Sequence, residues 1–154
     1  MIYRVISLCV GLLLFSNCGF KLADLEARYE VAEINTFGDK KVNYKLKSKI
    51  LNRSSDDNEN IVQISLNTKK VKLIKEKNIN NQITKYEINI KTDVKYKSLT
   101  KEIEGEFSIS KKGDYSISSK YSDTLRSEKN LINNLINEIS EEIFENLASN
   151  LNDL

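Results

Sequence analysis

Histidine, proline and tryptophan are absent from this chain of 154 residues, which has only two cysteines and five glycines. Without histidine the chain lacks the commonest general base and the commonest metal ligand of proteins. The glycines stand apart, at positions 11, 19, 38, 105 and 113, and form no Gly-rich phosphate loop. No serine stands in a nucleophile elbow. We therefore expect a protein that is not an enzyme and that has no metal site.

The first 18 residues have the pattern of a lipoprotein signal. A single positive charge, Arg4, precedes an apolar run over residues 5–15. This run has the length of a signal-peptide h-region and is too short to span a bilayer. Cys18 follows after Ser16 and Asn17, so we expect cleavage after residue 17 and a covalent lipid on Cys18, with no other cofactor. An ordinary secretory signal with a chance cysteine, or an N-terminal anchor, is the alternative.

Cleavage would leave residues 18–154 as a single domain without a reactive thiol. Cys9 would be removed with residues 1–17, and the lipid would occupy the sulfur of Cys18. No cysteine would then remain for a disulfide, a metal or a nucleophile. The remaining chain is long enough for one hydrophobic core but not for two. Stability must therefore come from packing alone.

Charge is distributed unevenly along this domain. Residues 61–121 carry 13 lysines against seven acidic residues, whereas residues 122–154 carry two basic residues against seven acidic ones. One interpretation is two solvated faces of opposite sign that help each other pack. The other is a cationic sheet surface that meets an anionic ligand. We expect no nucleic acid partner.

The first half of the domain predicts a strand, a helix and a long strand. We expect a strand over residues 28–35, then a helix over residues 40–52 with Asp39 as its N-cap. Residues 40–52 also fit strand alternation. A polar loop follows over residues 53–60. In the next strand, residues 61–75, the apolar phase changes after Leu66, which predicts a bulge near Thr68.

The second half predicts a meander of strands closed by a helix. We expect a hairpin turn at residues 78–81, strands over residues 82–97 and 101–110, and a turn at residues 111–114 into a further strand that reaches Tyr121. Apolar residues then recur every three or four positions to Leu151, which is typical of an amphipathic helix. Ser122 or Asp123 would cap its start.

Together these elements predict an α+β fold. We expect a two-layer sandwich in which two helices cover a mostly antiparallel sheet of four to five strands. The alternating apolar residues of the sheet would be buried against the closing helix. The residues expected in this core are Tyr86, Ile88, Ile90, Phe107 and Ile109.

The segment Cys18-Gly-Phe-Lys-Leu22 resembles the C-G-F-x-L opening of the LptE family of lipopolysaccharide-assembly lipoproteins. The order of strand, helix, meander and closing helix also resembles that family. So does the run from Tyr121 into a helix with an early glutamate, Glu128. The resemblance covers the whole of residues 18–154 and is mainly architectural.

The resemblance implies a lipid-anchored protein on the periplasmic side of the outer membrane. Members of the family plug the β-barrel LptD and help it to insert lipopolysaccharide into the outer leaflet, without catalysis. The resemblance assigns no ligand residues here, but Lys72, Lys75 and Lys77 are our candidates for contact with lipopolysaccharide, because they lie where the positive excess is largest and beside the expected turn at residues 78–81. They could instead only keep a sheet edge soluble. An accessory subunit of another lipid-transport system and a structural lipoprotein without a ligand are the alternative functions.

Overall fold

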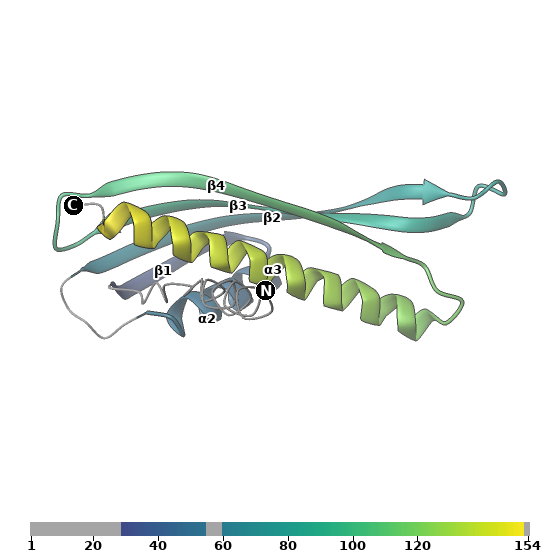
Figure 1. Cartoon of the computed structure of the whole chain (residues 1–154), viewed down its shortest axis with the longest axis horizontal. Coiled ribbons are helices and arrows are strands. Elements are labelled where there is room, and N and C mark those ends of the chain that lie inside the picture. Colours follow the sequence, from purple (N-terminus) through teal and green to yellow (C-terminus); the bar gives the residue numbers. More distant parts are fainter. Residues whose placement is uncertain (1–28, 55–59, 153–154) are drawn as a thin grey trace, which may run out of the picture.

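A computed structural model describes residues 29–54 and 60–152. The expected signal peptide, Cys18 and most of the predicted loop lie outside the described residues. Two helices lie on one side of a four-stranded sheet, with α3 running obliquely beneath the strands (Figure 1). The α+β layered fold predicted from the sequence is confirmed. Its elements are β1 (Glu30–Gly38), α2 (Lys40–Leu51), β2 (Ile61–Lys77), β3 (Ile83–Ser98), β4 (Glu104–Ser116) and α3 (Tyr121–Asn152).

The sheet is mixed, with the strand order β1-β2-β3-β4. β1 and β2 are parallel because α2 carries the chain back to the end of the sheet at which β1 began. The β2–β3 and β3–β4 pairings are antiparallel, as the meander predicted. The end of the β2–β3 hairpin forms one extremity of the molecule and projects past the first turn of α3 (Figure 1).

The ambiguous stretch after Asp39 is a helix, as preferred from the sequence. The Asp39 carboxylate accepts hydrogen bonds from the backbone N–H groups of Lys41 and Val42, at 3.1 and 3.0 Å. The helical stripe of Val42, Leu46 and Ile50 is buried. Tyr44, which would share a face with Val42 and Leu46 in a strand, is 77% exposed. The capped helix therefore buries the apolar residues that a strand would also have aligned.

The bulge predicted near Thr68 is wrong. β2 pairs with β3 in regular register from Val62 to Ile74, and the register shifts lie on either side of Glu76, near the turn. Thr68 continues the buried face, where its hydroxyl lies 3.1 Å from that of Thr92. The change of apolar phase has another cause: Leu73 lies on the opposite face and is 52% exposed. An apolar residue outside the core was mistaken for a core residue.

The turn predicted at residues 111–114 is also wrong, because β4 continues without a break to Ser116. Gly113 pairs with Ile88 inside the sheet. A Cβ atom at Gly113 would lie 2.6 Å from Cδ1 of Leu131 on α3. The glycine therefore makes room for the helix and does not form a turn. Tyr115 belongs to β4, and the further strand expected to reach Tyr121 does not form.

The closing helix begins slightly earlier than its expected caps. α3 starts at Tyr121, so Ser122 and Asp123 lie within its first turn and do not precede it. Asp123 still complements the helix dipole from this position. The Thr124 hydroxyl accepts a hydrogen bond from the Ser118 backbone N–H, at 2.9 Å, which ties the incoming chain to the first turn.

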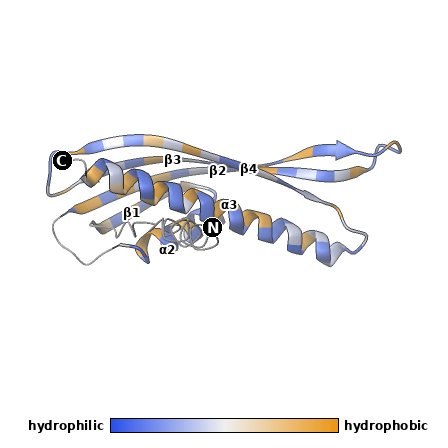
Figure 2. Ribbon diagram, in the orientation of Figure 1, coloured by the Kyte–Doolittle hydropathy of each residue, from blue (hydrophilic) through white to orange (hydrophobic). Residues whose placement is uncertain are grey.

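The core lies between the sheet and the apolar stripe of α3. Figure 2 shows hydrophobic residues recurring along α3 between hydrophilic ones. Ile88, Ile90 and Ile109 are buried as predicted, whereas Tyr86 and Phe107 are only partly buried. Within the described residues, α2 and α3 contain no stretch that is both long and apolar enough to cross a membrane. The buried residues of α3 include Leu135, Ile136, Ile139, Ile143, Leu147 and Leu151.

Candidate functional site

Lys72 lies on the helix-covered face of the hairpin, inside a small polar cluster. Its Nζ is 2.8 Å from Oε2 of Glu128 on α3 and 4.4 Å from the centre of the Tyr86 ring. The Tyr115 hydroxyl donates to the same Oε2 at 2.7 Å. Burial lowers the pKa of Lys72, but its contacts with Glu128 and Tyr115 outweigh burial and raise it overall. Lys72 therefore joins the hairpin to α3.

Lys75 and Lys77 lie away from this cluster. Lys75 Nζ is 2.8 Å from Oδ1 of Asp114, and Lys77 Nζ donates to Oδ1 of Asn81 at 3.0 Å. Asp114 directly precedes Tyr115 in β4, so its side chain points to the opposite face of the sheet from the Lys72 cluster. The structure thus places the three candidate lysines in three environments and does not bring them together. Two of them form ion pairs within the protein.

The turn between β2 and β3 is polar except at its apex. Asn81 adopts a left-handed conformation with φ of 59°, which asparagine tolerates better than most residues. The Asn78 side chain accepts hydrogen bonds from the backbone N–H groups of Asn80 and Gln82. These bonds confirm the turn predicted at residues 78–81. The Ile79 side chain is fully exposed at the end of the hairpin.

A groove of about 510 Å³ separates the N-terminal halves of α2 and α3. Its floor is apolar and includes Val42 and Ile136, which are buried. Tyr44 and Leu125 line its rim and remain 77% and 47% exposed. Most of its other lining residues carry charge: Lys40, Lys41, Lys45, Lys70, Lys129 and Glu128. The groove therefore combines a hydrophobic floor with a strongly cationic rim.

Several of these rim charges already have contacts inside the protein. Lys70 Nζ lies 3.2 Å from Oδ2 of Asp39, and Lys45 Nζ donates to Oδ1 of Asn133. Burial raises the pKa of Asp39, but its hydrogen bonds with Val42 and Lys70 lower the pKa overall. The Asp39 carboxylate is therefore charged near neutral pH.

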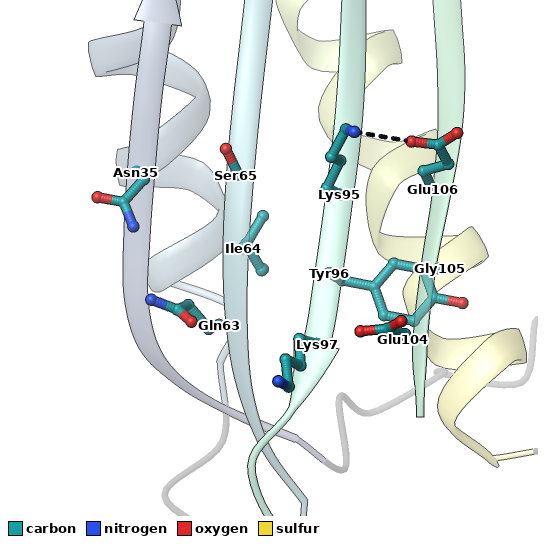
Figure 3. Close-up of a pocket in the computed structure, with 10 residues that line it drawn as sticks. All are labelled: Asn35, Gln63, Ile64, Ser65, Lys95, Tyr96, Lys97, Glu104, Gly105 and Glu106. Atoms are coloured by element: carbon teal, nitrogen blue, oxygen red, sulfur yellow. Dashed lines mark ion pairs between the residues drawn. The ribbon is translucent and has the colours of Figure 1, made fainter. Parts of the chain in front are cut away.

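A second hollow, of about 560 Å³, lies on the opposite face of the sheet. Residues paired across β2, β3 and β4 form two rows in this hollow. In one row Lys95 points toward Glu106 (Figure 3). Lys95 Nζ and Oε2 of Glu106 are 3.0 Å apart. Lys97 pairs in register with Glu104 in the next row. Lysines and glutamates balance in this hollow, so it has no preference for an anionic or a cationic ligand.

The helix groove was not predicted from the sequence, although one signal pointed to it. Lys40 and Lys41 begin a helix whose first turn contains no acidic residue. Cations at this position oppose the helix dipole. Among the described residues, no group of three or more acidic or cysteine side chains is placed to hold a metal ion.

The fold is similar to those of solved lipoproteins. The crystal structure of the rare lipoprotein B from Shewanella oneidensis matches 76% of this chain and 94% of its own, with a TM-score of 0.56 and 14% sequence identity. The solution structure of the uncharacterized lipoprotein B from Nitrosomonas europaea matches 85% of this chain and 91% of its own, with a TM-score of 0.53 and 12% identity. No protein-family model and no curated protein matches the sequence. The chain thus has a fold found in lipoproteins.

Proposed function

We propose that this chain is a non-enzymatic lipoprotein of the outer membrane, anchored through Cys18 on the periplasmic side. In this proposal it binds an LptD-type β-barrel and assists the insertion of lipopolysaccharide into the outer leaflet. The observation that carries the proposal is the lipoprotein fold, in a chain that also has the Cys18-Gly-Phe-Lys-Leu22 opening. Neither binding to the barrel nor insertion of lipopolysaccharide requires catalysis, because both processes change non-covalent contacts only.

The projecting hairpin supports contact with a partner. Its apex carries a fully exposed isoleucine, Ile79, and Leu73 and Ile74 are both about half exposed. Exposed apolar residues at the extremity of a molecule gain free energy when a partner removes them from water. The interior of a large barrel could accept such a hairpin because the hairpin extends beyond the helices (Figure 1).

Purification of the full chain from outer membranes in a mild detergent tests this proposal. A large β-barrel should copurify in stable association with the chain. An Ile79→Asp variant should retain less of the barrel, because it places a charge at the apex without touching the core. Ser110→Asp, an exposed change on β4, is the matched control and should retain it. Copurification of a different transport complex, or of no barrel, would contradict the proposal.

The hairpin lysines remain candidates for contact with lipopolysaccharide. Changing Lys72, Lys75 and Lys77 together to glutamine should weaken binding and reduce its salt dependence, because each charge removed is a screened attraction lost. An equal number of exposed lysines elsewhere in the sheet, changed in the same way, controls for net charge. Unchanged binding in the hairpin variant would show that the ion pairs of Lys72 and Lys75 serve the fold alone.

A further inference from the structure

We propose that the groove between α2 and α3 binds one anionic phospholipid. Its acyl chain would lie on the apolar floor, and its phosphate would contact Lys40, Lys41 and Lys129 at the rim. The site is distinct from the hairpin lysines. The inference deepens the proposed function and depends on one part of it, the placement of the chain at a lipid membrane.

The charge of the groove supports an anionic headgroup. Five lysines and a single glutamate line it. The Glu128 carboxylate already accepts hydrogen bonds from Lys72 and Tyr115, so part of its negative charge is offset inside the protein. Lys70 is paired with Asp39. Within residues 29–54 and 60–152, Lys40, Lys41 and Lys129 form no ion pair, so their charges remain available to a ligand.

The position of Lys40 and Lys41 points to the same ligand. Both lie in the first turn of α2, where the helix dipole is positive and which itself contains no acidic residue, so the N-cap Asp39 is the acidic group that serves this end of the helix. Asp39 satisfies two backbone N–H groups of this turn, but its second oxygen is engaged by Lys70. A phosphate at this end of α2 would offset the repulsion between the lysines and the dipole. An unfavourable local arrangement of this kind is typical of functional sites.

The floor and volume of the groove support an acyl chain. Val42, Ile132 and Ile136 line it, and Leu125 and Tyr44 leave apolar surface uncovered at its rim. A volume of about 510 Å³ lies within the range of sites for single small molecules. An acidic amphipathic helix from a protein would also match the charge. It would need apolar contacts over several helical turns on both walls, whereas the α2 wall of this groove spans only residues 40–45, less than two turns.

Native mass spectrometry of the full chain in a neutral maltoside detergent tests the proposal. The probes are palmitoyl-lysophosphatidylglycerol and palmitoyl-lysophosphatidylcholine, which share an acyl chain and differ in net headgroup charge. One molecule of the anionic probe should bind, about tenfold more tightly than the zwitterionic one. Equal binding of the two probes would overturn the proposal.

Two variants locate the site. Changing Lys40, Lys41 and Lys129 together to glutamine should lower the affinity for the anionic probe about tenfold, because charge-assisted contacts to the phosphate are lost. All three side chains are exposed, so the fold should persist. The matched control changes the exposed lysines Lys69, Lys97 and Lys112 to glutamine and should bind like the parent. Equal loss in the two variants would show nonspecific attraction and overturn the proposal.

A crosslinking experiment in cells identifies the occupant. A photoreactive benzoylphenylalanine replaces Tyr44, which lines the groove and is largely exposed. A lipid adduct supports the proposal, whereas a protein adduct, including a second copy of this chain, overturns it. The binding measurements use the isolated chain, so they do not depend on a barrel. A chain that retains a barrel but binds no anionic lipid would refute this inference and leave the proposed function intact.

Discussion

The junction between β1 and α2 should not tolerate a side chain at Gly38. Gly38 has a φ of +90°, and a Cβ atom there would lie 2.0 Å from the backbone oxygen of Thr68. The same oxygen accepts a hydrogen bond from the Asp39 backbone N–H, at 2.8 Å. Alanine would therefore have to hold a left-handed conformation and also displace a hydrogen-bonded carbonyl group.

The loss of stability expected for Gly38→Ala follows from these two effects and from a third, in the unfolded chain. The left-handed conformation costs about 1–2 kcal/mol in a residue other than glycine. Weakening the Asp39–Thr68 hydrogen bond costs about 1 kcal/mol more. Alanine also restricts the unfolded chain, which returns about 0.4–1 kcal/mol. We expect the free energy of unfolding to fall by about 2 kcal/mol, which should lower the urea midpoint by roughly 1 M.

Gly113→Ala is the matched control. Its new Cβ would meet Cδ1 of Leu131 at 2.6 Å, but that atom ends a flexible side chain that can change rotamer. We expect a loss of about 0.5–1 kcal/mol. Urea unfolding followed by far-ultraviolet circular dichroism measures both variants. If the midpoint of Gly38→Ala falls no further than that of Gly113→Ala, the reasoning about this junction is wrong.

Three further predictions follow from the core, the polar cluster and the N-terminus. Ile139→Ala should lower the free energy of unfolding by about 2–5 kcal/mol because this side chain is fully buried. Leu125→Ala, on the same helix but 47% exposed, should have a smaller effect, and equal urea midpoints would contradict the packing of α3. Burial raises the pKa of Glu128, but hydrogen bonds from Lys72 and Tyr115 lower this pKa overall. The contribution of Glu128 to the free energy of unfolding is therefore complete above the unfolded pKa of about 4.3 and is lost as the pH falls through the folded pKa. Glu128→Gln should therefore be less stable than the parent at neutral pH and approach it in acid, and a gap independent of pH would refute this. The intact mass of the mature chain should show that residues 1–17 have been removed and that acyl groups have been added to Cys18. A different first residue, or a lack of acyl mass, would disprove the lipid anchor.

The closing helix and the hairpin turn could be predicted because local chemistry determines them. Ten apolar residues at three- and four-residue steps leave no alternative to a helix between Tyr121 and Asn152. The asparagines around Ile79 suit a turn through their side-chain hydrogen bonds and the left-handed φ of Asn81. In both segments the pattern and the tertiary structure favour the same conformation.

The errors arose where tertiary contacts decide the role of a residue. Gly113 is a turn residue by composition, but it belongs to β4 because Leu131 of α3 packs against it. Leu73 fits a core pattern, yet the hairpin leaves it exposed on the outer face. The groove was missed for the same reason, because Lys40 and Lys129 are far apart in sequence and meet only when α2 and α3 pack together.

The parallel pairing of β1 and β2 makes the domain a spacer of defined length. Both strands start at the same end of the sheet, where Glu30 pairs with Ile61. From there β2 runs for 17 residues to Lys77, a distance of roughly 55 Å along the strand. Tyr29 therefore enters the domain at the end opposite Ile79. A contact made at the hairpin tip therefore lies roughly 55 Å from the point where the preceding chain joins the domain, and the paired strands hold that separation fixed.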